Sequence, residues 1–172
     1  SSDGSLTNDG IWASKLRLDQ PLIIAELIRN GVLTNLSSEL LAGIVAVFVN
    51  DKFRDIDLDS AVQWERRPLL DAYYSMKRAV EPLMDLKKRH SFDTPLIQFW
   101  PAAALYMWAC LESWETVIQL TSIDEGDLAM LIFRTADNLR QIMSLESTHP
   151  RLAQLARTSI SRLLREPVII PV

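Results

Sequence analysis

The chain has 172 residues, of which 48% are hydrophobic and only five are glycine, so its size and composition predict one well-cored globular domain. Its net charge of −4 and pI near 5.2 argue against a protein that binds nucleic acid by charge alone. The single cysteine, Cys110, excludes an internal disulfide and fits a reducing compartment, so we expect a cytoplasmic location. We interpret Cys110 itself as a small apolar core residue.

The amino end of the chain is polar and has neither the basic nor the apolar region of a signal peptide. We interpret residues 1–10 as a flexible linker or the edge of an expressed fragment, and residues 11–172 as the domain. Residues 12–18 alternate between apolar and polar side chains, which favours an extended leading segment. No uncharged apolar run is long enough to span a membrane, so no membrane contact is expected.

Two helices are predicted in the first third of the chain. The first follows residues 19–20, carries Pro21 in its first turn and ends near Gly31, where a left-handed cap is expected. The second covers residues 37–50 and is apolar nearly all round, so we expect it to be buried at the centre. A buried strand over residues 44–49 is the alternative.

Residues 51–60 hold alternating aspartates and basic side chains, and we interpret them as a solvated loop. The spacing of Asp55, Asp57 and Asp59 resembles part of a calcium loop. The glycine and the final glutamate of such a loop are missing, so no metal site is expected here.

A long helix is predicted over residues 68–90, with a kink at Pro82. The basic run at residues 87–90 lies at the carboxyl end of this helix, where the helix dipole favours cations. A phosphate contact is the less favoured interpretation of these charges.

The next segments combine prolines with aromatic residues. A proline-marked crossing over residues 92–101 precedes a helix over residues 102–111 and a shorter helix begun by Ser113. Four aromatic side chains lie close together in this stretch: Trp100, Tyr106, Trp108 and Trp114. We interpret them as core filling between helices, with base stacking as the alternative.

A helix of about five turns is predicted between Thr121 and Leu145. Ser122 and Glu125 have the spacing of a capping box at its start. Seven residues form an apolar stripe suited to a core: Leu128, Leu131, Ile132, Thr135, Leu139, Ile142 and Met143. Four residues fall on a second stripe nearly opposite: Met130, Arg134, Asp137 and Gln141.

Pro150 is expected to begin a last helix, followed by an apolar tail over residues 168–172. No hairpin signal and no internal repeat is found. The sequence therefore predicts an all-α fold, a single helical bundle of about seven helices with one long central helix.

Sequence motifs of catalysis are absent from this chain. It has no glycine-rich phosphate loop, no dinucleotide-binding turn and no nucleophile elbow. The two histidines, His90 and His149, lie at predicted helix ends without ligand partners at a useful spacing. We therefore expect no catalytic residue, no metal ligand and no cofactor in this domain.

Three segments, taken in order, resemble one known family. They are residues 16–49, residues 106–115 (Tyr-Met-Trp-Ala-Cys-Leu-Glu-Ser-Trp-Glu) and residues 124–142, which contain Asp-Glu-Gly-Asp-Leu and Phe-Arg-Thr-Ala-Asp-Asn-Leu-Arg-Gln-Ile. Together they are similar to the DSHCT domain, the carboxyl-terminal helical domain of Ski2-like and Mtr4-like superfamily 2 RNA helicases. Three positions depart from the family pattern. Met130 stands where an arginine is frequent, Phe133 stands in place of the first arginine of an Arg-Arg pair, and Glu112 stands where the family has glycine.

The resemblance implies that the helix within residues 121–145 is a ratchet helix that lines the channel for single-stranded RNA. Arg134 and Asp137 match the family's base-contacting arginine and acidic residue, and Met130 and Gln141 share their face. The implied partners are single-stranded RNA (or DNA) and the motor lobes of the same full-length chain. ATP and Mg would be bound by those lobes, because this domain carries no motif for them.

Two alternatives stay open at this point. Arg134 and Asp137 could form an exposed ion pair three residues apart with no ligand. The domain as a whole could be a scaffold that docks a partner protein through its acidic surface or through residues 168–172. A stand-alone enzyme is the least supported interpretation.

Overall fold

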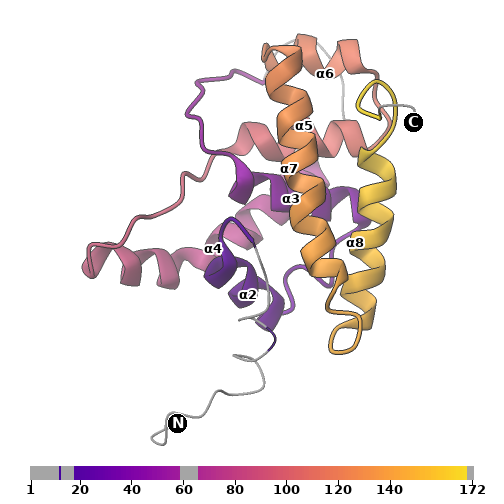
Figure 1. Ribbon diagram of the computed structural model, residues 1–172. Helices are drawn as coiled ribbons and strands as arrows, with labels where there is room; N and C mark the ends of the chain where they lie inside the picture. Colours follow the sequence, from indigo (N-terminus) through magenta and orange to yellow (C-terminus); the bar gives the residue numbers. More distant parts are fainter. Residues whose placement is uncertain (1–11, 13–17, 59–65, 170–172) are drawn as a thin grey trace, which may run out of the picture.

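The computed structural model describes residues 12, 18–58 and 66–169, and seven helices make up the regular structure of these residues (Figure 1). The described residues contain no strand, which confirms the all-α class. The predicted linker 1–10, most of the segment 12–18, Asp59, Ser60 and the last three residues of the tail lie outside the described part. The helices are α2 (Pro21–Arg29), α3 (Ser38–Val49), α4 (Arg67–Arg89), α5 (Phe99–Ala109), α6 (Trp114–Thr121), α7 (Glu125–Met143) and α8 (Pro150–Leu163).

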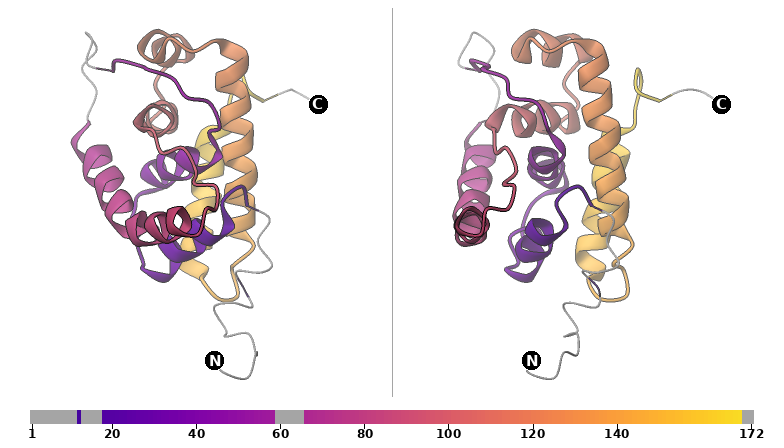
Figure 2. Two further views of the ribbon diagram at one scale, coloured as in Figure 1. Left: turned by 90° about the vertical axis from the view of Figure 1, so that its left-hand side faces the viewer. Right: turned by 60° about the vertical axis from the view of Figure 1, so that its left-hand side comes forward.

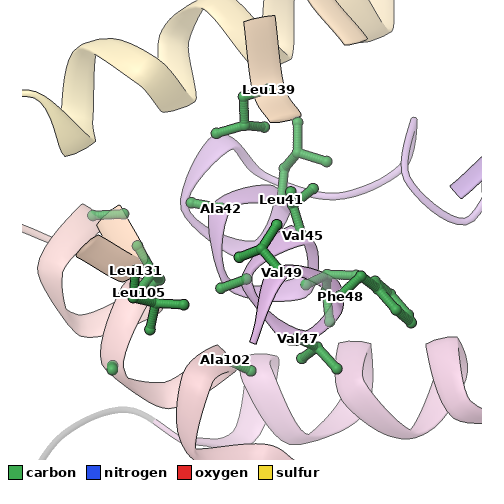
Figure 3. Close-up of a cluster of buried hydrophobic side chains, with 14 of the residues drawn as sticks. Leu41, Ala42, Val45, Val47, Phe48, Val49, Ala102, Leu105, Leu131 and Leu139 are labelled. Atoms are coloured by element: carbon green, nitrogen blue, oxygen red, sulfur yellow. The ribbon is translucent and has the colours of Figure 1, made fainter. Parts of the chain in front are cut away.

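Helix α3 is the centre of the packing, as its sequence predicts. Ten of its twelve residues are buried, and it contacts α4, α5, α7 and α8. Figure 3 shows side chains from α5 and α7 around it, including Leu105 and Leu131. The hydroxyl of Ser37 begins the helix by accepting from the backbone N–H of Leu40 at 3.2 Å. The alternative of a buried strand over residues 44–49 is wrong.

The closest approach to α3 is made by α5. A Cβ built on Gly43 would lie 2.9 Å from the carbonyl oxygen of Ala102, so only glycine fits there. Helix α5 begins at Phe99, three residues before the predicted start, and its alanines 102–104 are buried at this crossing. Small side chains on both helices therefore set the distance between them.

Helices α7 and α8 lie side by side and together cover one side of α3 (Figures 1 and 2). Two buried hydrogen bonds hold α8 in place. The hydroxyl of Ser159 donates to the carbonyl oxygen of Ser38 at 2.6 Å, and the indole N–H of Trp108 donates to that of Leu163 at 2.8 Å. These bonds satisfy polar groups that the apolar core would otherwise leave unpaired.

Helices α2 and α4 contact each other on another side of the molecule. Helix α2 carries Pro21 in its first turn, and Gly31 follows it with a φ of 74°, as predicted. Helix α4 continues through Pro82 and ends in the basic run of residues 87–89. No helix in the described part of the chain is both long and apolar enough to cross a membrane.

The structure corrects the predictions made for Cys110 and for the aromatic cluster. Cys110 is exposed at the end of α5 rather than buried in the core, although partial desolvation raises the pKa of its thiol. Core filling is confirmed for Trp100 and Trp108, which are buried, whereas Tyr106 and Trp114 are only partly buried. Cys110 is exposed because it follows Ala109, the last residue of α5, and so lies beyond the buried turns of that helix.

The predicted cap of α7 is also wrong. Ser122 ends α6 in a left-handed conformation, and its N–H donates to the carbonyl oxygen of Ile118 at 2.8 Å. The cap of α7 is Asp124, whose carboxylate accepts from the backbone N–H of Asp127 at 2.8 Å. Ile123 between the two is buried, so the chain turns there and the helix begins later than the capping-box spacing predicts.

We expect Gly43→Ala to destabilise the protein by about 1–3 kcal/mol, because the added methyl group meets the backbone of α5. Urea denaturation followed by circular dichroism measures this change. Gly126→Ala is the matched control, since its Cβ meets nothing closer than a carboxylate oxygen of Asp124 at 3.4 Å. It should stabilise the protein or change its stability by less than about 1 kcal/mol. Equal losses in the two variants would contradict the close α3–α5 crossing.

We expect Asp124→Ala to lower the free energy of unfolding by about 1 kcal/mol, because it removes the side-chain cap of α7. Ser122→Ala should stay within about 0.5 kcal/mol of the parent chain, since the Ser122 side chain is exposed and caps no helix start. Thermal denaturation of both variants tests the assignment. The opposite order of effects would restore the capping box predicted from the sequence.

Candidate nucleic-acid interface

Helix α7 has one face in the core and one face turned away from it. Six of the seven residues predicted for the core stripe are buried, and Met143 is partly buried. Leu131 and Leu139 point toward α3 in Figure 3. Ala136 and Asn138 are also buried on this side, which the apolar pattern did not include. The amphipathic interpretation of the helix is therefore confirmed.

The four residues predicted to contact RNA differ in exposure. The side chain of Asp137 is 72% exposed, and Met130 is 59% exposed. Arg134 and Gln141 are partly buried. This face is therefore accessible to solvent along its length, but the side chain of Arg134 is less exposed than those of Met130 and Asp137.

Arg134 lies between two carboxylates from distant parts of the sequence. Its guanidinium is 3.3 Å from Asp19 Oδ1 and 3.5 Å from Asp51 Oδ2. Asp137 pairs instead with Arg140, at 2.5 Å. The alternative ion pair between Arg134 and Asp137 is not formed, because each of them has a nearer partner.

Asn138 fixes the segment before α2 on this helix. Its side-chain N–H donates to Asp19 Oδ2 at 2.8 Å, and its side-chain oxygen accepts from the backbone N–H of Asp19 at 3.1 Å. The same amide donates to the carbonyl oxygen of Arg134, one turn earlier, at 2.9 Å. Sequence reasoning missed this residue. An asparagine in the middle of a helix, where it is a poor helix former, was the available signal.

The loop after α3 supplies two further cations at the beginning of α7. Lys52 Nζ lies 3.0 Å from Asp127 Oδ1, and Arg54 forms an ion pair with the other oxygen of Asp127. This loop was predicted to be solvated. That prediction is wrong for Arg54, which is partly buried, and for Leu58, which is buried. In the described part of the chain, no group of three or more potential ligands could hold a metal ion.

Arg54 is held by α5 as well as by α7. Gln98 accepts from the backbone N–H of Arg54 at 3.0 Å and donates to its carbonyl oxygen at 3.1 Å. The Arg54 guanidinium lies 5.7 Å from the ring centroid of Trp100. A small pocket of about 50 Å³ remains between this loop and the outward face of α7, beside Met130 and Arg134. Its size suits a water molecule or the tip of a side chain and excludes a whole nucleotide base.

Charge pairing changes the titration of one group at this site. The hydrogen bond from Lys52, and the nearby charges of Lys52 and Arg54, hold the pKa of Asp127 below its usual range. Asp127 is therefore ionised at neutral pH and neutralises part of the positive charge of the loop. The interface as a whole presents arginines and lysines whose charges are largely balanced by neighbouring carboxylates.

The sequence pattern of the DSHCT (NUC185) domain family matches residues 3–170 of this chain. The chain belongs to this family. The resemblance inferred from three segments is confirmed by this match, which covers almost the whole sequence.

The DSHCT domain described here is also similar to a relative from Arabidopsis thaliana, the DExH-box ATP-dependent RNA helicase DExH15, chloroplastic. The two sequences are 28% identical over 164 residues. The match covers 92% of this chain and 14% of the relative, so the chain spans about one seventh of the length of that helicase. The match relates the chain to one domain of a larger protein.

We expect Lys52→Met to raise the pKa of Asp127 toward its ordinary value, because its first hydrogen-bond partner is lost. Carboxyl-carbon NMR titration measures this pKa directly. Because the pKa of Asp127 is lower in the folded state than in the unfolded state, its ionised form stabilises the fold at pH values above the ordinary pKa of aspartate. This stabilisation is lost as the pH falls through the lowered pKa. Lys88→Met, on α4, is the control and should leave Asp127 unchanged. An unchanged pKa in Lys52→Met would contradict the ion pair.

Proposed function

We propose that this DSHCT domain is the carboxyl-terminal helical domain of an ATP-dependent RNA helicase and lines its channel for single-stranded RNA. The observation that carries the proposal is the family match over nearly the whole chain. In this proposal α7 is the ratchet helix. Arg134, Asp137, Met130 and Gln141 contact the bases or backbone of the strand.

The chemistry of the α7 face supports a contact that tolerates any sequence. A guanidinium such as that of Arg134 can stack on any base and donate to base edges, whereas the thioether of Met130 offers an exposed apolar surface. Asp137 can accept hydrogen bonds from base amino groups. Single-stranded DNA presents the same base faces, so it is an expected second ligand.

The charge balance of the face supports weak and reversible binding. Arg134 must share its guanidinium with Asp19 and Asp51, which are both at least partly exposed. Exposed ion pairs of this kind contribute about 0–1 kcal/mol, so a strand can replace them at little cost. A strand that is drawn past the helix should be held loosely, and this arrangement meets that requirement.

We propose that ATP and Mg are bound outside this domain. The sequence has no phosphate-binding loop, and the described residues contain no cluster of three or more histidine, cysteine or acidic side chains placed to hold a metal ion. We therefore assign nucleotide binding to motor lobes of a longer protein and derive no step of hydrolysis here. The partners in this proposal are single-stranded RNA and those motor lobes.

We keep a cytoplasmic location as the proposal that follows from the single, unpaired cysteine. The relative from Arabidopsis thaliana carries the word chloroplastic in its name. A fluorescent fusion of the full-length gene product tests this: signal confined to an organelle would replace the cytoplasmic assignment.

We expect the chain to bind a fluorescein-labelled single-stranded RNA weakly at low salt, and Arg134→Ala to weaken this binding by about three- to tenfold, as loss of one stacking cation does. Fluorescence anisotropy at low and moderate salt measures both. Arg151→Ala, an exposed arginine at the beginning of α8, removes the same charge away from α7.

The two arginine variants separate a specific contact from general attraction. A larger loss for Arg134→Ala than for Arg151→Ala places Arg134 on the path of the strand. Equal losses of RNA affinity in the two variants would mean that only the net charge of the domain matters. If the parent chain does not bind RNA at low salt, RNA contact by this domain is contradicted. Circular dichroism checks that both variants keep the parent fold.

A further inference from the structure

A groove of about 790 Å³ lies between α6, the first half of α7 and the segment that follows α8. Figure 1 shows these three elements together at the end of the molecule where α6 lies. The groove runs along a flank of α7 and includes none of the four residues assigned to RNA. It is therefore a second surface of the same helix, with its own chemistry.

The floor of the groove is apolar and has no described partner. Trp114 is partly buried, and its ring packs edge-to-face on Trp108 with centroids 5.4 Å apart. Phe133 is 40% exposed. Ala129, Pro167 and Val168 complete the floor. An exposed aromatic side chain such as Phe133, beside a partly buried tryptophan and small apolar side chains, is typical of a surface that receives a partner.

The rim of the groove is acidic. Glu115, Glu125 and Glu166 line it, and all three are exposed. Glu125 accepts from the indole N–H of Trp114 at 3.2 Å. Among the residues that the structure describes, none of these three carboxylates forms an ion pair with a lysine or arginine. Their charge is therefore available to an incoming cation.

Arg165 is the one basic residue in the described lining of the groove, and its guanidinium contacts Trp108 and two backbone carbonyl groups instead of the glutamates. Its guanidinium lies 3.2 Å above the ring centroid of Trp108. It also donates to the carbonyl oxygens of Trp108, at 2.9 Å, and of Glu112, at 2.7 Å. Burial lowers the pKa of Arg165, and its guanidinium is occupied by Trp108 and by the two carbonyl oxygens. Within residues 18–58 and 66–169, no lysine or arginine neutralises the acidic rim.

We propose that this groove docks a segment of a partner protein that carries lysine or arginine among apolar residues. The apolar side chains of such a segment would cover Phe133 and Trp114. Its cations would lie against the three glutamates and over the indole ring, which attracts cations through its face. Nucleic acid fits this surface poorly, because three carboxylates would face its phosphates. The proposal does not depend on RNA contact by the neighbouring outward face of α7.

The test uses the 172-residue chain, labelled with ¹⁵N, and a synthetic peptide that repeats Leu-Arg-Leu-Lys. We expect saturable binding that shifts the NMR signals of the Trp114 indole and of the Ala129 and Val168 amides. Phe133→Ala should weaken binding by about tenfold, as loss of an aromatic anchor does. The double change Glu115→Gln and Glu166→Gln should weaken it mainly at low salt.

Matched variants and peptides decide between specific docking and nonspecific attraction. Leu86→Ala removes a comparably exposed apolar side chain of α4, away from the groove, and Glu81→Gln removes a negative charge from the same helix. Neither should change the affinity. The proposal would be overturned by equal affinity for oligoarginine of the same charge, by full affinity in Phe133→Ala, or by single-stranded RNA shifting the same groove signals. Phe133 is exposed enough that its truncation should leave the fold intact, which circular dichroism checks.

Discussion

The burial of α3 on all sides is the constraint on which the rest of this structure depends. Its neighbours α4, α7 and α8 each cover it with one apolar face, whereas α5 is itself buried over most of its length. The contact with α5 is possible only because Gly43 has no side chain opposite the backbone of Ala102. A helix surrounded in this way fixes its neighbours in place and leaves their outer faces free for other tasks.

Helix α7 uses that freedom on two sides. Its outward face carries Arg134 and Asp137 among paired charges, which suits transient contact with a polyanion that must move. Its flank toward α6 carries Phe133 beside glutamates that form no ion pair with any described residue, which suits a cationic protein segment. In the two proposals made above, α7 offers these surfaces to ligands of opposite charge, because the two surfaces point in different directions around its axis.

Polar contacts between distant segments give the outward face its present form. Asp19 binds both Arg134 and Asn138, and Asp127 binds both Lys52 and Arg54. Each contact joins α7 to a segment that has no regular structure. The face is therefore stabilised by ion pairs and hydrogen bonds at its rim and by the apolar core underneath, so that changes in pH or salt should affect the rim first.

The sequence by itself determined the all-α class, the central position of α3 and the inward stripe of α7, because hydrophobic periodicity repeats within a single helix. It also supplied the three segments that resemble the DSHCT family. The tertiary structure alone decided which charges meet. Asp51 lies more than eighty positions from Arg134, Ser122 lost the cap of α7 to Asp124, and Cys110 lies in solvent. Such outcomes follow from how the helices are oriented around α3, and no local pattern in the sequence encodes that orientation.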